Sequence, residues 1–245
     1  MPDKTLNSNR RADQTRKAIL RAAIREFSTH GLAGARTDTI AESAKVNKAL
    51  LYYYFKSKQG LYAAAIDEVS SGVAERALAA LDPKHSAGEQ LLRTALSHFD
   101  RILTKRDFQS LMQQEMVRMR RGESKALPSM VENVFRPILD KLRAAVHDGI
   151  QSGELCPVDW LQVVYSALGA NVLYFLSAPM MRLLLPFDPL APAVIEARRK
   201  AAVQYLGNAL FVDRAHGARL VKRVLADMPM PKPRLLHPRV GRKFL

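Results

Sequence analysis

The sequence has few of the features on which secreted proteins depend. It carries a single cysteine, Cys156, among 245 residues, so no disulfide can form within the chain, and a reducing compartment is the expected setting. Residues 1–11 are polar and lack the apolar core of a secretion signal. These absences indicate a protein of the cytoplasm.

The common catalytic and cofactor motifs are missing as well. The chain has no Gly-x-Gly-x-x-Gly fingerprint, no phosphate-binding loop, no His-Glu-x-x-His zinc motif and no Gly-x-Ser-x-Gly elbow. Six histidines are scattered along the chain and, with one cysteine, form no ligand cluster for a metal. We therefore expect a binding protein rather than an enzyme, with no catalytic residues, no metal and no cofactor.

Negative charge is scarce at both ends of the chain. Residues 1–60 hold 12 Lys and Arg against 5 Asp and Glu, and residues 216–245 hold 8 against 1. The stretch between them, residues 61–215, is nearly neutral, with 18 against 17. Such an asymmetry favours a polyanionic partner at the termini and a different role for the middle.

Apolar residues recur at helical spacing along most of the chain, and no stretch shows sustained strand alternation. The pattern predicts an all-α protein with a polar, disordered segment over residues 1–12. Helices are expected at about 13–30, 37–44, 47–55, 57–80, 86–104, 107–121, 128–152, 157–181, 189–212 and 215–226.

The most informative stretch runs from residue 36 to residue 61 and reads as two short helices across a tight turn. Thr37 and Asn47 are the expected N-caps, while Leu51 and Phe55 fall four residues apart on an inward face. The opposite face carries Lys48, Tyr52, Tyr53 and Lys56. Folding explains such a face poorly, whereas a recognition helix in a major groove would use it.

Residues 17–66 resemble the DNA-binding domain of the TetR/AcrR family of bacterial repressors. The matching elements, in order and spacing, are Phe27, Gly31, Thr37, Ile40-Ala41, Val46, Leu51 to Phe55, Lys58 and Leu61. Two positions depart from the family pattern: Lys45 replaces the glycine of the turn, and Tyr54 replaces a histidine. A non-glycine residue at a position that needs positive φ costs roughly 1 kcal/mol.

The resemblance implies an N-terminal three-helix helix-turn-helix domain followed by a C-terminal helical domain for ligand binding and dimerisation. We expect DNA contacts from the positions that match this domain, which are Arg36, Thr37, Asn47, Lys48, Ala49, Tyr52, Tyr53, Tyr54, Lys56 and Lys58. Of these, Lys48, Tyr52 and Tyr53 would face bases or sugar and phosphate.

The middle of the chain offers candidates for an effector site. Three methionines at spacings of four and three lie near Phe108, and methionine suits an adaptable pocket, although such a stripe is more often plain core. Polar groups on apolar stretches complete the set, each of which is at least as often a satisfied core or interface group. The candidates are His98, Phe108, Met112, Met116, Met119, Tyr165, Asn171 and Tyr174.

Residues 160–185 form the longest apolar run, marginal in length for a membrane span. Asn171 lies at its centre and Pro179 is expected to interrupt its far end, so a helix buried between two layers is the better interpretation. Paired with the helix that follows, it predicts a two-fold four-helix contact between copies, which is also where the family places its dimer interface.

Three domains are predicted: residues 1–60 as a helix-turn-helix DNA-binding domain with an N-terminal arm, 61–212 for ligand binding and dimerisation, and 213–245 as an extra helix with a basic, proline-rich tail. The tail is either a solubilising extension or a non-specific DNA clamp. The leading hypothesis is a dimeric cytoplasmic repressor, associated with the nucleoid when bound, that a small apolar or amphipathic effector releases from a palindromic operator. The alternatives are a non-specific architectural DNA-binding protein and a helical carrier of a hydrophobic ligand.

Overall fold

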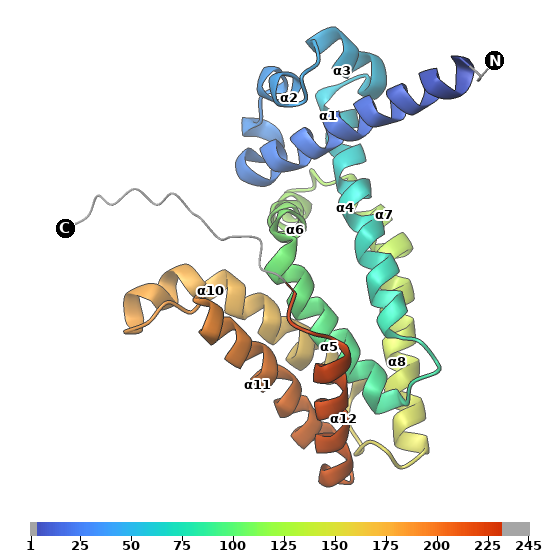
Figure 1. The fold of residues 1–245 in the computed structure, drawn as a ribbon, viewed down its shortest axis with the longest axis vertical. Coiled ribbons are helices and arrows are strands. Elements are labelled where there is room, and N and C mark those ends of the chain that lie inside the picture. The colour runs from blue at the N-terminus through green and yellow to red at the C-terminus, as the bar shows by residue number, and fades with distance from the viewer. Residues whose placement is uncertain (1–3, 232–245) are drawn as a thin grey trace. The chain divides into compact units, whose positions relative to one another are not determined.

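The computed structural model describes the backbone of residues 4–231 and the side chains of residues 10–231. The described chain is helical, as predicted, and its only extended pairing is an isolated antiparallel bridge between Leu155 and Phe211. The elements, labelled in Figure 1 where there is room, are α1 (Lys4–Gly34), α2 (Thr37–Ser43), α3 (Lys48–Phe55), α4 (Lys58–Ala80), α5 (Ala87–Thr104), α6 (Arg106–Arg120), α7 (Ala126–Met130), the π-helical turn η1 (Val131–Phe135), α8 (Arg136–Gln151), α9 (Trp160–Val164), the π-helical turn η2 (Tyr165–Gly169), α10 (Ala170–Leu184), α11 (Pro192–Leu210) and α12 (Arg214–Asp227).

These elements form two compact units. The first comprises the chain up to residue 79 together with residues 106–140, and therefore holds α1 to α3, nearly all of α4, and α6, α7 and η1. The second comprises residues 80–105 and the chain from residue 141, and holds α5, most of α8, and α9 to α12. The predicted boundaries at residues 60 and 212 separate proposed functions, whereas the two units are defined by contacts within the structure. The predicted boundaries therefore stay predictions.

The core of the first unit is built around the inward faces of α1, α2, α3 and α4. Phe27 is fully buried, and its ring meets the ring of Tyr62 edge to face at a centroid distance of 5.0 Å. Ile40 of α2 and Leu51 of α3 are fully buried as well. Burial of such side chains contributes roughly 1.5–3 kcal/mol each, so these contacts fix the small helices of the N-terminal half on α1 and α4.

Helix α1 differs from expectation at its start and agrees at its end. The prediction of disorder was wrong for residues 4–12, because the helix begins at Lys4, and residues 1–3 lie outside the described residues. No proline or glycine separates Lys4 from the periodic apolar segment, so the helix can extend through this polar stretch. The helical dihedrals break at Gly31, where φ is 68°, at the predicted position.

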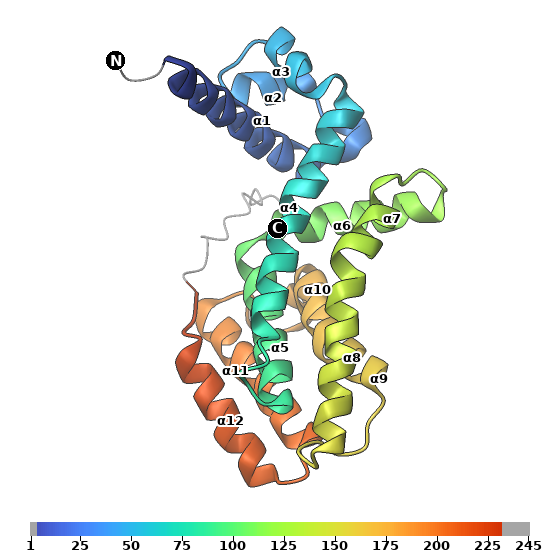
Figure 2. The same ribbon diagram turned by 90° about the vertical axis from the view of Figure 1, so that its right-hand side faces the viewer.

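The second unit is organised around α5. Phe99 and Leu103 of α5 are buried against Ile195 of α11, and Tyr174 and Phe175 of α10 pack on the same cluster. In Figure 2, α11 and α12 lie side by side next to α5. The crossing of α11 and α12 depends on glycine, because a Cβ on Gly217 would lie 2.4 Å from the carbonyl oxygen of Gly207.

Two predicted helices contain π-helical turns. The segment expected as one helix over residues 128–152 is α7, η1 and α8, and the segment expected over 157–181 is α9, η2 and α10. The predicted interruption at Pro179 was wrong, because α10 continues through it to Leu184. A proline removes one backbone hydrogen bond of a helix and often bends it, and α10 tolerates that loss.

Burial of the long apolar run was also predicted wrongly for the single chain. Trp160–Leu184 is long and apolar enough to cross a membrane by length and composition alone, yet only 17% of its most apolar window is buried. Leu173, Leu176 and Leu183 are 62, 55 and 87% exposed. Contacts with α5 and α11 therefore cover one side of the run and leave the other side open.

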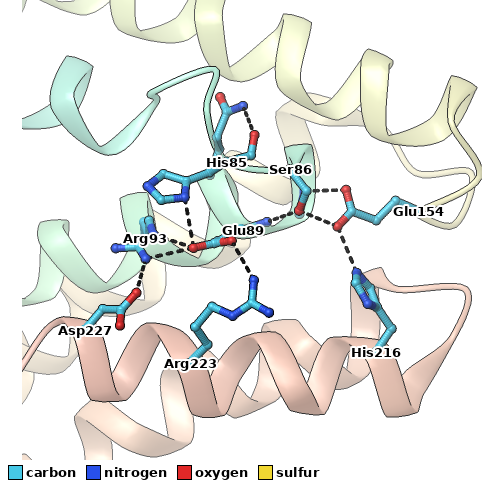
Figure 3. A network of polar contacts seen from close by, with 10 residues as sticks. His85, Ser86, Glu89, Arg93, Glu154, His216, Arg223 and Asp227 are labelled. Carbon is cyan, nitrogen blue, oxygen red and sulfur yellow. Dashed lines mark hydrogen bonds and ion pairs between the residues drawn. The ribbon is translucent and has the colours of Figure 1, made fainter.

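Helix α12 is held on α5 by a polar network (Figure 3). The buried carboxylate of Glu89, in the first turn of α5, lies 3.0 Å from the His85 ring and 2.8 Å from the Arg93 guanidinium. His85 lies just before α5, and Arg93 lies in α5. Arg223 of α12 reaches the same carboxylate at 3.6 Å. One buried carboxylate is thus contacted from both helices, which fixes the register of α5 and α12.

The chain after α12 stays on the second unit as far as it is described. Arg199 of α11 is buried, pairs with Asp100 of α5 through two hydrogen bonds of 2.7 and 2.8 Å, and also donates to the carbonyl oxygen of Met228. Met230 packs on the Phe99 cluster. The predicted roles of the tail from residue 232 lie outside the described residues.

Candidate nucleic-acid interface

The turn between α2 and α3 places the predicted recognition helix. Asn47 precedes α3 in an extended conformation, and its side-chain oxygen accepts a hydrogen bond of 2.7 Å from the Leu50 backbone N–H, which confirms the predicted cap. Lys45, at the position where the family has glycine, has a φ of 56°. The turn therefore keeps the left-handed geometry that glycine favours, with a lysine in its place.

The inner side of α3 fixes which residues face outward. Leu51 is fully buried and Phe55 is 6% exposed, four residues apart as predicted. The guanidinium carbon of Arg16 in α1 lies 5.5 Å from the centre of the Phe55 ring. Because both anchors lie on one side of α3, the side chains of Lys48 and Tyr53 point away from the core, and Tyr53 is 69% exposed.

Lys48 has a partner on the neighbouring helix. Its ammonium lies 2.9 Å from one carboxylate oxygen of Asp38 in α2 and 3.1 Å from the other. This hydrogen bond and the charge of Asp38 raise the pKa of Lys48 above its ordinary value, so the group stays cationic. Lys48 is therefore a permanent donor, held near the first turn of α2.

The expected role of Thr37 as a helix cap was wrong. Arg36 occupies the capping position, no side chain caps α2, and Thr37 is its first residue and is 9% exposed. The Thr37 hydroxyl instead lies 3.3 Å from the Tyr52 hydroxyl. The two hydroxyls thus form one donor and acceptor pair at the place where α2 and α3 meet.

Aromatic rings and a lysine continue the outer face of α3. The rings of Tyr53 and Tyr54 meet at 5.4 Å nearly at right angles. Lys56 folds back over Tyr53, with its ammonium 5.5 Å from the ring centre and 3.1 Å from the Tyr53 carbonyl oxygen. The aromatic rings therefore orient a cation at the C-terminal end of α3.

The remaining predicted contacts flank this face. The Lys58 ammonium donates to the Ala33 carbonyl oxygen at 3.1 Å, and the Arg36 backbone N–H donates to the Glu26 carboxylate at 3.0 Å. The first unit contains all ten predicted DNA contacts. The exposed members are Arg36, Asn47, Lys48, Ala49, Tyr53 and Lys56, whereas Tyr52, Tyr54 and Lys58 are half-buried and Thr37 is buried.

Sequence reasoning missed the acidic residues that organise this interface. Asp38 lies in the first turn of α2, where a carboxylate suits the helix dipole, but its contact with Lys48 was not expected, and no role was expected for Glu26. Their partners lie ten residues further along the chain in both cases. A separation of ten residues has no periodic signature, so only the packing of α1, α2 and α3 brings these pairs together.

The predicted effector residues divide between the two units. In the first unit, Phe108 and Met112 are buried, whereas Met116 and Met119 are 55 and 48% exposed. The three methionines therefore do not share one buried lining. Helical periodicity places Met116 and Met119 near the side of α6 that carries Met112, so their exposure means that the core covers this side only as far as Glu115.

In the second unit, Asn171 is the best-placed candidate. It is 1% exposed, its amide nitrogen donates to the Ala95 carbonyl oxygen at 3.0 Å, and its amide oxygen has no hydrogen-bond partner among the described residues. It lines a cavity of about 330 Å³ together with Ser166, Arg198 and Tyr205. The other three candidates do not line this cavity.

Those three candidates have separate environments. Tyr165 is 66% exposed, and the Tyr174 hydroxyl donates to the Pro189 carbonyl oxygen. Burial, with a smaller contribution from the charge of Arg101, lowers the pKa of His98 to about 3, so its ring is neutral. The Nδ1 atom of His98 is buried and has no hydrogen-bond partner in the described part of the chain.

Comparison with known proteins agrees with the geometry of this interface. Residues 19–65 match the family model described as bacterial regulatory proteins of the tetR family, and residues 88–206 match the model described as the tetracyclin repressor-like C-terminal domain. The two models cover both the helix-turn-helix region and the helices of the neutral middle.

Individual relatives are similar over most of their length. The transcriptional repressor NicS of Pseudomonas putida is 29% identical, over 59% of this chain and 69% of its own. The transcriptional regulator RutR of Escherichia coli K12 is 28% identical, over 71% and 79%. The structure of FadR from Bacillus subtilis in complex with stearoyl-CoA has a TM-score of 0.58 and 20% identity, over 78% and 96%.

Proposed function

The chain belongs to the TetR family of bacterial transcriptional regulators, and we propose that it is a dimeric repressor released from a palindromic operator by a small effector. The single observation that carries this proposal is the outer face of α3. Lysine and tyrosine side chains lie exposed there on a helix that is otherwise fixed by Leu51 and Phe55. A basic and aromatic face of this kind suits base edges and phosphates in a major groove.

Dimerisation would use the apolar side of α10. Leu173, Leu176 and Met180 follow one another at helical spacing and are each more than half exposed, and Tyr205 of α11 is 65% exposed. An exposed apolar surface of this extent normally marks an interaction site. A membrane is the less fitting partner, because Asn171 in the same run is committed to a hydrogen bond with α5.

A two-fold dimer explains how an effector would act. Two recognition helices held by one symmetry axis match successive major grooves only at a separation of about 34–36 Å. The volume of the cavity beside Asn171 lies at the lower end of the range for ligand sites, and the cavity combines an unpartnered amide oxygen with apolar walls. We place the effector there and expect a small amphipathic molecule, with the protein in the cytoplasm and on the nucleoid when bound to DNA.

Selection of genomic fragments with the purified protein tests the proposal. We expect an enriched palindrome, bound by the dimer, with a preference over random duplex that survives at physiological salt. Lys48→Ala should weaken binding to the palindrome by about 1–3 kcal/mol, the value of one good base contact.

Three results would contradict the proposal or one of its parts. Affinity that follows salt and hardly depends on sequence would indicate an architectural DNA-binding protein. Equal weakening of operator and random DNA by Lys48→Ala would make Lys48 a phosphate contact rather than a base contact. A hydrophobic ligand that binds without any change in DNA affinity would instead indicate a carrier.

A further inference from the structure

A second cavity lies within the first unit, between the end of α1, the start of α4 and α6. Its volume is about 760 Å³, and Ser28, residues 30–33, Lys58 and Gln59 line one side while α6 and the turn after it line the other. We call it the α1–α6 cleft. None of the predicted effector residues lines it, so it is separate from the cavity beside Asn171.

The charges in the α1–α6 cleft do not balance. Lys58, Arg118 and Arg121 line it with His30, and Glu123 is the one carboxylate among the lining residues. Arg118 is already engaged, because it donates to the buried carboxylate of Glu115 at 2.8 Å and to the Glu123 carbonyl oxygen at 2.9 Å.

Two cations are left over. Lys58 donates only to a backbone carbonyl, and within residues 10–231 the Arg121 guanidinium has no hydrogen-bond or ion-pair partner. The cleft therefore attracts an anion. A guanidinium is the side chain best suited to it, because its planar fork matches a carboxylate in two parallel hydrogen bonds.

The cleft also contains an acceptor that lacks a donor. The Gln114 amide nitrogen donates to the Ser28 carbonyl oxygen at 3.2 Å, which orients the amide. Its oxygen is buried and has no partner among the described residues. A buried acceptor without a donor costs free energy, so an occupant of this cleft would gain by bringing an N–H or O–H group.

We propose that the α1–α6 cleft binds a small hydroxycarboxylate, with the carboxylate on Arg121 and Lys58 and the hydroxyl donating to the Gln114 oxygen. A phosphate monoester dianion fits less well, because its phosphoryl group carries no donor for Gln114. The cleft joins the end of α1 and the start of α4 to α6, so an occupant would fix elements that carry the predicted DNA contacts. An effect of the occupant on DNA binding rests on the proposed function, whereas the binding of a hydroxycarboxylate to the cleft does not.

Calorimetric titration of the full chain with citrate tests the site, at constant ionic strength adjusted with chloride. We expect saturable binding of one citrate per protomer. Tricarballylate, which has the same three carboxylates and no hydroxyl, should bind several-fold more weakly, because it leaves the Gln114 oxygen without a donor. Gln114→Leu should remove this difference between the two acids.

Variants of α6 separate a built site from general attraction to a basic protein. Arg121→Gln should weaken citrate binding about tenfold, the loss of one charge-assisted contact. Arg120→Gln makes the same change in charge on the adjacent exposed residue, which does not line the cleft, and should leave the affinity unaltered. Glu123→Gln removes the only carboxylate of the lining and should strengthen binding.

Three results would overturn the proposal: no saturable binding of citrate, equal weakening by Arg120→Gln and Arg121→Gln, or equal affinity for citrate and tricarballylate. Thermal unfolding of each variant shows that it is folded before the titrations are compared. Operator binding is measured separately without citrate, so a failure of this site and a failure of the proposed function give different results.

Discussion

The Lys48 ammonium lies 2.9 Å from the Asp38 carboxylate and joins the first turn of α3 to the first turn of α2. Both side chains are about half exposed or more, at 49 and 66%. A pair this exposed contributes little to the free energy of unfolding, since solvent screens it. The pair instead orients the Lys48 side chain, because it restricts the directions in which this lysine of the recognition helix can extend.

Asp38→Asn tests this orienting role. The substitution removes a negative charge beside the DNA-binding surface, so affinity for random duplex should rise. A neutral amide oxygen accepts a weaker hydrogen bond from Lys48 than a carboxylate does, so Lys48 is held less firmly. The preference for the operator over random duplex should therefore fall, by a few-fold for one loosened base contact. The measurement is the ratio of the two dissociation constants at one salt concentration.

Glu42→Gln is the matched control for that measurement. Glu42 lies on the same helix, is exposed, and has no side-chain partner among the described residues. Its neutralisation should strengthen binding to both duplexes alike and leave their ratio unchanged. A ratio that falls equally in both variants would show that Asp38 acts only through its charge.

The turn between α2 and α3 gives a prediction on stability. Lys45 has a φ of 56°, and a left-handed conformation costs a non-glycine residue about 1–2 kcal/mol. Glycine removes that cost but loses about 0.5–1 kcal/mol more backbone entropy on folding. The first effect is larger, so Lys45→Gly should raise the free energy of unfolding by about 0.5–1 kcal/mol in a denaturant titration.

Lys45→Ala separates the backbone effect from loss of the lysine side chain. Alanine keeps the conformational cost of positive φ, so it should leave the free energy of unfolding close to that of the parent. If alanine stabilised the chain as much as glycine does, the lysine charge rather than the backbone would be the cause.

Local patterns in the sequence were sufficient to predict the cap and the buried face of the recognition helix. The Asn47 cap and the burial of Leu51 and Phe55 involve neighbours three or four residues apart, which is the range that helical periodicity reports. The same reasoning located the break in α1 at Gly31, because glycine takes positive φ without strain.

Features that depend on distant segments were out of reach of the sequence. Glu115 reads as one more polar residue of α6, yet it is fully buried, and its carboxylate accepts a hydrogen bond from Tyr62, 53 residues earlier. Exposure of Leu176 was missed for a related reason, since hydropathy shows that a helix is apolar and not which side its own chain covers. The α1–α6 cleft likewise exists only once both helices are in place.

The hydrogen bond between Tyr62 of α4 and Glu115 of α6 predicts a strong energetic coupling between these two helices. The Tyr62 hydroxyl donates to Glu115 at 2.7 Å, and burial together with that carboxylate raises the pKa of Tyr62, so the hydroxyl remains a donor. Tyr62→Phe should lower the free energy of unfolding by about 1.5–3 kcal/mol, the range for a hydrogen bond to a charged group.

A double-mutant cycle with Glu115→Gln isolates that contact. The two substitutions should interact by more than about 0.5 kcal/mol, because each removes one side of the same hydrogen bond. Additive effects in chemical denaturation would show that the two side chains stabilise the unit independently, and the contact would then carry no coupling.

The attachment of α12 predicts a dependence of stability on pH. Burial alone would raise the pKa of Glu154, but hydrogen bonds from the Gly88 backbone, the Ser86 hydroxyl and the His216 ring outweigh it and hold the pKa below its usual 4.5 (Figure 3). A depressed carboxyl pKa stabilises the fold above the unfolded-state value, and this stabilisation is lost as pH falls through the folded-state value.

Glu154→Gln should therefore flatten the fall in the free energy of unfolding below about pH 4.5. Glu75→Gln, at an exposed position of α4, is the control and should leave the slope as it is. Parallel curves for Glu154→Gln and the parent in acid titrations would show that the Glu154 network forms no stronger in the folded chain than in the unfolded one.

The exposed side of α10 predicts the assembly. Leu176 is 55% exposed in the single chain, and in a two-fold contact a glutamate at this position would be buried without a partner. Leu176→Glu should therefore raise the dimer dissociation constant at least about tenfold in sedimentation equilibrium, equivalent to about 1.4 kcal/mol. Met119→Glu, an equally polar change on an exposed residue of α6, should leave the dissociation constant unaltered.

Operator affinity of Leu176→Glu should fall at low protein concentration and recover as the concentration rises, because two linked recognition helices bind a palindrome far better than one. A monomeric parent chain, or a Leu176→Glu variant that dimerises normally, would place the contact on another surface.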